Sequence, residues 1–267
     1  MDFPADWKAY VDDMRREAPE SRSRMRTVGR QSNAATLGGR DEEGVESHGR
    51  PGSNGQAGEL LTASGIAKTY TRGIWPRRRS LKVLRGADLV LESGEIVGLV
   101  GENGSGKSTL MKILVGGIDR DAGIITKSGS VGYCPQDPIL YERLSSDEHF
   151  ELFGRAYGMT GDAVDKVRDD LYETLGFGEW RDSRVEELSG GTRAKLNLGL
   201  ALLPDPDLLL LDEPYAGFDW DTYQRFWQLT RQRRDAGRSL LIISHFITDA
   251  DRFDRIYDLV DGKAVPR

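Results

Sequence analysis

The residues best suited to chemistry form a glycine-rich run that fits the pattern G-x-x-x-x-G-K-[ST]. Its members are Gly101, Glu102, Asn103, Gly104, Ser105, Gly106, Lys107, Ser108 and Thr109. Glycines let the backbone curl around phosphate groups, and the helix that follows adds the positive end of its dipole. We expect Lys107 to reach the β- and γ-phosphates of a nucleotide and Ser108 to ligate Mg²⁺. The alternative is a glycine-rich strand–helix turn with an incidental lysine.

A second run, Leu208–Leu211 followed by Asp212 and Glu213, places two carboxylates at the end of a leucine-only strand. Such a run alone is often no more than an element boundary. Open α/β sheets bind ligands at the carboxyl ends of their strands, however, and this run lies downstream of the phosphate loop. We expect Asp212 to hold magnesium through water and Glu213 to orient and polarise the attacking water.

A pentapeptide between these two motifs, Leu188–Thr192, reads LSGGT. Serine and glycine residues that open a helix form an anion site, although they also serve as a simple helix cap. The pentapeptide resembles the LSGGQ signature of ABC ATPases, which occupies the same place in the order of motifs. The resemblance implies that Ser189, Gly190 and Gly191 bind the ATP held by a second subunit, in a head-to-tail dimer around two ATP molecules. Thr192 replaces the family's usual glutamine.

Further single residues follow the order of the same family. Gln136, after a strand-like segment, resembles the glutamine that touches magnesium and senses a transmembrane partner. His245, at the end of Ile-Ile-Ser-His, resembles the switch histidine that contacts the γ-phosphate; a surface histidine at a strand end is the alternative. The resemblance therefore gives a catalytic set and a metal-binding set. The catalytic set is Lys107, Gln136, Glu213 and His245, and the metal-binding set is Ser108, Gln136 and Asp212.

Two positions match the family less closely. Tyr70 resembles the aromatic residue that stacks on adenine, but a basic insertion at 72–80 lengthens its separation from the phosphate loop. That insertion either contacts a phosphate-bearing partner or, as we favour, forms a solvated hairpin tip. Asp219 matches the loop that follows the acidic strand, whereas Tyr215 and Phe218 depart from the family's usual residues there.

The elements needed to position these motifs are those of an α/β domain. Glu95–Val100, Leu208–Asp212 and Leu240–Ser244 are expected to be buried strands, and they alternate with helical runs such as Lys107–Val115. This alternation predicts a P-loop NTPase core with a mostly parallel sheet and helices on both faces.

Helical periodicity continues between the phosphate loop and the acidic strand. Phe150, Phe153 and Tyr157 share one helix face after a cap at Ser145 or Ser146, and a second helix is expected to stop at Gly176. The apolar run Ala194–Leu203 is also expected to be helical. The family resemblance implies a helical subdomain at about 140–205 and an antiparallel β subdomain at the N-terminal side of the core.

Composition divides the chain near residue 58. Residues 18–58 contain no Phe, Trp or Tyr, which predicts a disordered tail. Residues 1–17 have an aromatic pattern that predicts a short amphipathic helix, which either docks on a partner or the domain, or is marginal on an unstructured tail. That pattern consists of Phe3, Trp7, Tyr10 and Met14. The family resemblance implies that residues 59–267 form an ABC ATPase domain.

The charge and the apolar pattern restrict the class of protein. A net charge of −6 argues against general nucleic-acid binding, and a single cysteine, Cys134, fits a reducing compartment. We expect no signal peptide and no membrane-spanning run. The chain is thus expected to be cytoplasmic and held at the cytoplasmic face of the membrane by a separately encoded transmembrane permease.

The function implied is the ATP-hydrolysing subunit of an ABC transporter, with ATP and Mg²⁺ at its site. The tract Pro135–Gly158 looks like the stretch found in drug- and lipid-efflux exporters, so we favour export. The alternatives are an importer ATPase and a soluble ABC ATPase that works without a membrane partner in translation or DNA maintenance. A nucleotide kinase would keep the phosphate loop but not LSGG or Glu213.

Overall fold

A computed structural model describes residues 58–72, 79–244 and 247–267 of the chain, all within the compact unit Gln56–Arg267. The strands are β1 (Glu59–Arg72), β2 (Arg79–Glu92), β3 (Ile96–Val100), β4 (Ala122–Lys127), β5 (Val131–Cys134), β6 (Leu208–Asp212), β7 (Ser239–Ile243), β8 (Arg255–Val260) and β9 (Lys263–Pro266). The helices are α2 (Lys107–Val115), α3 (Ser146–Ala156), α4 (Gly161–Leu175), α5 (Gly190–Leu202) and α6 (Trp220–Asp235), with short turns η2 (Gly178–Trp180), η3 (Val185–Glu187) and η4 (Ile247–Arg252).

The larger sheet has the order β5-β6-β7-β3-β8-β9, and only the β8–β9 pair is antiparallel. Strands β3, β6 and β7 are buried along their whole length, which matches their apolar sequences. The strand predicted over Leu208–Asp212 has the predicted bounds, and the other two lie within one residue of them. The predicted parallel P-loop core is confirmed.

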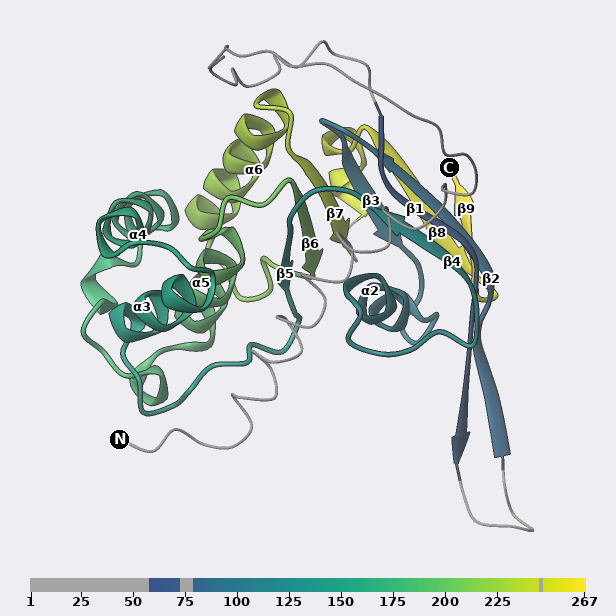
Figure 1. Cartoon of the computed structure of the whole chain (residues 1–267), viewed down its shortest axis with the longest axis horizontal. Helices are drawn as coiled ribbons and strands as arrows, with labels where there is room; N and C mark the ends of the chain where they lie inside the picture. Colours follow the sequence, from purple (N-terminus) through teal and green to yellow (C-terminus); the bar gives the residue numbers. More distant parts are fainter. Residues whose placement is uncertain (1–57, 73–78, 245–246) are drawn as a thin grey trace, which may run out of the picture. The chain divides into compact units, whose positions relative to one another are not determined.

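This sheet separates two apolar cores, because successive residues of a strand point to opposite faces. Leu209 and Leu211 belong to one core, while Leu208 and Leu210 belong to the other. The second core also contains α2 and the three-stranded antiparallel sheet β2-β1-β4. In Figure 1, α2 lies between the two sheets. The antiparallel β subdomain expected from the family resemblance is therefore present.

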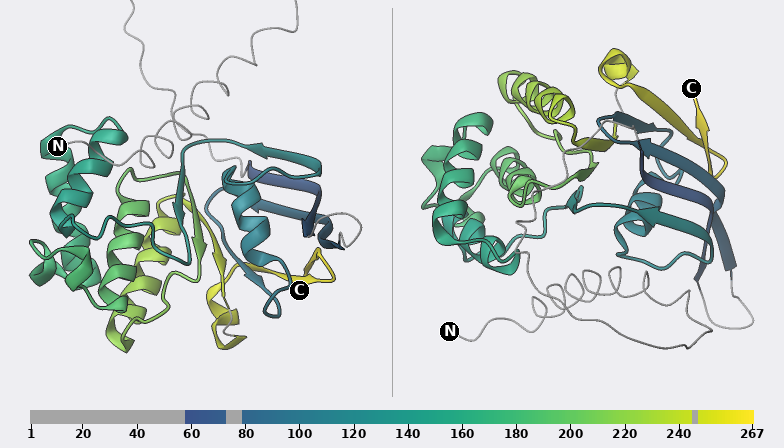
Figure 2. Two further views of the ribbon diagram at one scale, coloured as in Figure 1. Left: turned by 90° about the horizontal axis from the view of Figure 1, so that it is seen from below. Right: turned by 45° about the horizontal axis from the view of Figure 1, so that its top comes forward.

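The first core packs the helices α3, α4 and α5 against the other face of the large sheet, and both views of Figure 2 show these helices gathered on one side. Helix α3 begins with a capping box in which Ser145 Oγ accepts from the Glu148 N–H. Helix α4 ends at Gly176 in the left-handed conformation, as predicted. Phe150 is fully buried, and burial of such a side chain stabilises the folded state by about 1.5–3 kcal/mol relative to leaving it exposed.

One helix differs from its prediction. The apolar helix expected over Ala194–Leu203 begins four residues earlier, since α5 is Gly190–Leu202. The reason is the cap: Ser189 Oγ accepts from the Thr192 N–H at 3.1 Å, so the glycines form the first turn.

Several predictions lie outside the described residues: the amphipathic helix at 1–17, the tail at 18–58 apart from its last residue, and most of the insertion at 72–80. In the part of the chain that the structure describes, no helix combines the length and the apolar character needed to cross a bilayer.

Candidate active site

The phosphate loop joins β3 to α2 at the carboxyl end of the parallel sheet. Gly106, the residue before the first turn of α2, has φ +109°, a conformation that a side chain would strain. A Cβ there would also lie 2.8 Å from the Val83 side chain. The N–H groups of the first turn have no partner within the helix and are available to an anion. Ser105 Oγ is buried and has no hydrogen-bond partner among the described residues.

Lys107 folds back over this loop. Its Nζ donates to the Gly101 carbonyl at 2.8 Å and to the Glu102 carbonyl at 3.0 Å. Burial lowers the pKa of Lys107, and the carboxylates of Glu213 and Asp212 act against that change. A part-buried ammonium that donates to the neutral carbonyls of Gly101 and Glu102 would gain from an anionic acceptor such as a phosphate.

Ser108 and Asp212 bring oxygen atoms together from α2 and β6. Ser108 Oγ donates to Asp212 Oδ1 at 3.4 Å, and Asp212 is 1% exposed. Burial raises the pKa of Asp212 and the charge of Glu213 raises it further, while the Ser108 hydrogen bond opposes the rise. A hydroxyl and a carboxylate are the hard oxygen ligands that suit Mg²⁺, and a cation would offset the burial of this carboxylate. These residues fit a magnesium ion.

A magnesium site here would not need a dense cluster of protein ligands. Across the described ranges, no group of three or more His, Cys, Asp and Glu side chains is placed to hold a metal. Magnesium usually keeps several waters and uses substrate phosphates, so one carboxylate with Ser108 and Gln136 is a sufficient protein contribution.

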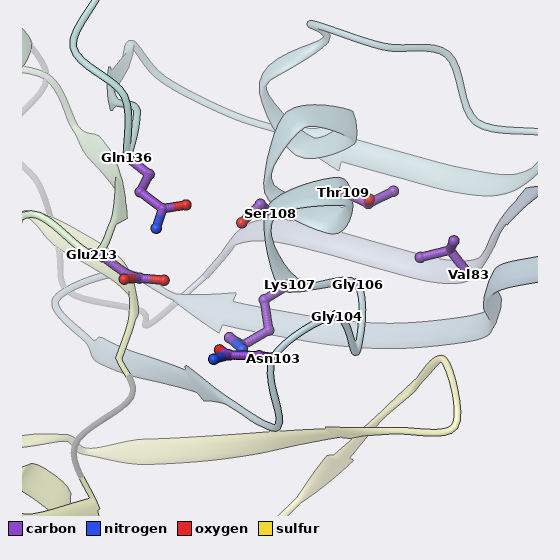
Figure 3. A pocket seen from close by; sticks show the side chains of 9 residues that line it. All are labelled: Val83, Asn103, Gly104, Gly106, Lys107, Ser108, Thr109, Gln136 and Glu213. Atoms are coloured by element: carbon purple, nitrogen blue, oxygen red, sulfur yellow. The ribbon is translucent and has the colours of Figure 1, made fainter. Parts of the chain in front are cut away.

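A cavity of about 600 Å³ lies against the phosphate loop, within the usual size range of ligand sites, about 300–1,000 Å³. Figure 3 shows Gln136 and Glu213 on one side of the loop and Val83 on the other. The residues that line the cavity are Val83, Asn103, Gly104, Gly106, Lys107, Ser108, Thr109, Gln136 and Glu213. The fold thus brings three predicted motifs, distant in sequence, to one cavity.

Glu213 has an unusual backbone. Its φ is +53°, a left-handed conformation that costs a non-glycine residue on the order of 1–3 kcal/mol. Its N–H donates to the Ile243 carbonyl at 3.3 Å, across from β6 to the end of β7. Strain held by neighbouring structure is common where a side chain must be aimed at a substrate.

Gln136 lies two residues after the end of β5, and a residue of α5 holds the segment that leads to it. Asn197 on α5 is 8% exposed and its Nδ2 donates to the Pro135 carbonyl at 2.8 Å and to Cys134 Sγ at 3.2 Å. Burial raises the pKa of the Cys134 thiol, which keeps it in the neutral form. Asn197 could not be predicted from the sequence, because nothing near it indicates a contact with Pro135, about sixty residues earlier in the chain.

The signature residues do not line the phosphate cavity of their own chain. Ser189 caps α5 and also contacts Thr192 Oγ1 at 2.9 Å. Gly190 lines a smaller cavity of about 100 Å³, which also touches Gln136 and Glu213. Gly191 packs against the Gly217 carbonyl. The start of α5 is therefore not part of the wall of its own chain's phosphate cavity, although the cavity at Gly190 shares Gln136 and Glu213 with it.

The remaining predicted residues are placed as follows. Tyr70 lies on β1, pairs with Leu81 on β2 and is not among the cavity-lining residues; its contact with adenine stays a prediction. His245 lies outside the described residues. Asp219 caps α6 through Thr222, which lowers the pKa of Asp219 to about 2. Val83 lines the cavity although no sequence signal separates it from other strand valines.

Comparison with known proteins identifies the family. A sequence model described as ABC transporter matches residues 84–216. The Nod factor export ATP-binding protein I of Burkholderia lata is 34% identical over 213 residues, which cover 75% of this chain and 70% of that protein. This chain belongs to the ABC transporter ATP-binding family. It is an ATPase of the ABC type.

Other similar ABC proteins come from distant organisms. The linearmycin resistance ATP-binding protein LnrL of Bacillus subtilis is 29% identical over 77% of this chain and 68% of its own length. ATP-binding cassette sub-family A member 10 of Homo sapiens is 30% identical over 76% of this chain and 14% of its own length.

Solved ABC cassettes have the same fold. The ATP-binding subunit of an ABC transporter superposes with a TM-score of 0.69 at 25% identity, covering 78% of this chain and 89% of that one. A cassette solved as a dimer in a post-hydrolysis state with ADP and Pi has a TM-score of 0.70 at 21% identity, covering 78% and 98% of the two chains.

Proposed function

We propose that this chain is the ATP-hydrolysing subunit of an ABC exporter, that it dimerises head to tail around two ATP molecules and that it drives a separately encoded permease. The observation that carries the proposal is the cavity in which the phosphate loop, Gln136 and Glu213 meet. It provides a cation, an anion site at a helix start, oxygen ligands and a carboxylate around one space.

The binding part of the reaction falls to the phosphate loop. The Lys107 ammonium binds the β- and γ-phosphate oxygens, and the N–H groups at the start of α2 bind the same anion. Magnesium, when bound, neutralises phosphate charge as that charge moves during transfer. Ser108, Asp212 and Gln136 are the residues that would hold it. Val83 forms an apolar wall of the cavity on the side away from Glu213.

Glu213 is the residue that acts on the attacking water. Its carboxylate accepts a hydrogen bond from the attacking water and orients that water in line with the terminal phosphate. The left-handed backbone at Glu213 aims this side chain into the cavity from the end of β6. His245 is proposed to contact the γ-phosphate, on the strength of its place in the family's order of motifs.

The head-to-tail dimer follows from the position of the signature. Ser189 and Gly190 are not among the residues that line their own chain's phosphate cavity, so a phosphate bound by them would be supplied by a second copy or a homologous subunit. A similar cassette has been solved as a dimer, at 23% identity.

Export is favoured over import because similar proteins carry names of export and resistance functions. The permease that such a subunit serves would hold it at the cytoplasmic face of the membrane, and no nucleic acid partner is proposed.

The test pairs two variants with one control. Lys107→Ala should lose ATP binding with the fold intact, and Glu213→Gln should keep ATP binding while turnover falls about 10²–10⁴-fold. Gel filtration of Glu213→Gln with ATP should show a dimer. Lys166→Ala is a matched control, since it removes an exposed lysine of α4 that does not line the cavity. Normal hydrolysis by Lys107→Ala contradicts the proposal.

A further inference from the structure

A buried pair of hydroxyl groups links the loop after Glu213 to the end of β7. Tyr215 Oη donates to Ser244 Oγ at 2.5 Å, and these residues are 6% and 0% exposed. The Ser244 N–H in turn donates to the Leu99 carbonyl at 3.3 Å, on the strand that leads into the phosphate loop. Tyr215 is a position where the sequence departs from its family, so the family's pattern does not account for this contact.

The ring of Tyr215 is held firmly. It packs edge-on against Tyr223 and Phe226 of α6, each at a centroid distance of 5.4 Å. Edge-to-face aromatic pairs add about 0.5–1.5 kcal/mol beyond the area they bury, so the ring has little freedom to move. A hydroxyl on a fixed ring is a rigid attachment point.

The turn that runs from Glu213 to Tyr215 is attached at both ends, first to the last residue of β7 and then to the residue that follows β7. The Glu213 N–H donates to the Ile243 carbonyl, and two residues later the Tyr215 hydroxyl donates to Ser244. The strained, left-handed backbone of Glu213 persists only if its surroundings hold it. The second attachment joins Tyr215, two residues after Glu213, to Ser244, the residue that follows β7, so it restrains the turn that aims the carboxylate.

We propose that Tyr215 is a positioning residue for ATP hydrolysis: its hydroxyl, through Ser244, fixes the loop that aims Glu213 into the phosphate cavity. The proposal rests on the function proposed above, because it needs Glu213 to act on the attacking water. Tyr215 itself does not line the phosphate cavity, so it acts on Glu213 and not on nucleotide binding.

The experiment removes single oxygen atoms and compares the result with a matched tyrosine. Tyr215→Phe and Ser244→Ala should each lower kcat about threefold to tenfold, with KM for ATP and ATP affinity unchanged. The double variant should be slowed by clearly less than the product of the two single effects, because the contact between the two hydroxyl groups is already broken in each single variant. Tyr257→Phe is the control: Tyr257 is also 6% exposed, and its hydroxyl contacts the backbone of Val90, away from the cavity.

The control separates positioning from stability. Both Phe variants should lose a similar small amount of stability in urea, but only Tyr215→Phe should lose kcat. Unchanged kcat in Tyr215→Phe, in a protein whose turnover is lost in Glu213→Gln, overturns the positioning role and leaves the proposed function intact. Turnover that survives Glu213→Gln overturns the proposed function, and with it this inference. Equal loss of kcat in Tyr257→Phe also overturns the positioning role.

Discussion

Gly190 and Gly191 are adjacent in the signature but have different surroundings. A Cβ on Gly191 would lie 2.6 Å from the Gly217 carbonyl oxygen, closer than real side chains come to backbone. A Cβ on Gly190 would meet nothing within 4 Å. Gly191 is thus needed for the contact between the start of α5 and the loop before Asp219, whereas a methyl group on Gly190 would contact no other atom of its own chain.

These surroundings predict opposite outcomes for two alanine variants. Gly191→Ala should cost about 1–3 kcal/mol in the free energy of unfolding, because backbone must shift to admit the methyl group. Gly190→Ala should leave stability unchanged or slightly higher, since alanine favours a helix. Its ATPase activity should nevertheless fall about a hundredfold, as expected when a contact to the reacting phosphate is blocked. Urea unfolding and steady-state ATPase assays check both.

The comparison also has a clear negative outcome. If Gly190→Ala hydrolyses ATP at the normal rate, the open surface at Gly190 does not receive a phosphate. If the two variants lose equal stability, the contact between Gly191 and Gly217 does not hold the loop.

Among the helices, α3 carries a buried histidine that joins it to the segment after Gln136. His149 is fully buried; its Nδ1 donates to the Ser145 carbonyl at 2.7 Å and its Nε2 accepts from the Tyr141 N–H at 2.9 Å. This pattern requires the neutral ring, because a protonated Nε2 would face another donor. Burial lowers the pKa of His149, against the smaller raising effects of the Ser145 carbonyl and Glu148.

The lowered pKa predicts how stability depends on pH. Between the two pKa values the unfolded chain binds more protons than the folded chain, so the free energy of unfolding rises with pH there. The contribution of neutral His149 is complete above the ordinary value of 6.5 and is lost as the pH falls from there toward the folded pKa. His149→Gln should therefore be less stable at pH 7 but lose less stability than the wild type on acidification.

Urea midpoints measured from about pH 7.5 to about pH 5 test this expectation. The slope of stability against pH is the decisive quantity, since other groups titrate equally in both proteins. Parallel slopes for wild type and variant would show that His149 keeps its ordinary pKa.

Local sequence patterns predicted elements well where the determinants are local. Helix α2 and strand β6 have the predicted bounds, and the stop at Gly176 is where glycine favours the left-handed conformation. Helix α5 begins earlier than its apolar pattern predicts, because that pattern starts only after the glycine-containing first turn. The order β5-β6-β7-β3-β8-β9 joins segments far apart in the chain, and no local pattern specifies it.

The same limit applies to the candidate site. Its motif residues could be predicted because the phosphate loop and the acidic strand each have a recognisable spacing. Val83, Asn197 and the hydroxyl of Ser244 could not, since each acts through a contact between distant segments. The spacing of residues in the sequence therefore predicts the motif residues of the site, whereas the residues that position them depend on tertiary packing.

For the whole molecule, the question is which subunit's signature acts on which nucleotide. In a head-to-tail dimer, Ser189 of one chain acts on ATP bound by Lys107 of the other. Ser189→Arg should then leave ATP binding by the isolated chain intact while hydrolysis is lost, because a long cation blocks the approach of the second subunit. The change also removes the cap of α5, which costs about 1 kcal/mol. Ser189→Ala removes the same cap without the cation and is the matched control.

Mixing the inactive chains tests the shared site directly. A dimer of one Ser189→Arg chain and one Lys107→Ala chain has one site with both defects and one with neither. Random pairing at equal amounts makes half of the dimers mixed, so activity should return to about a quarter of the wild-type rate if sites act independently. ATP binding by isolated Ser189→Arg decides the matter even if the sites are too cooperative for rescue. Loss of binding as complete as in Lys107→Ala, with Ser189→Ala still binding, would place the signature in its own chain's pocket and rule out the head-to-tail arrangement.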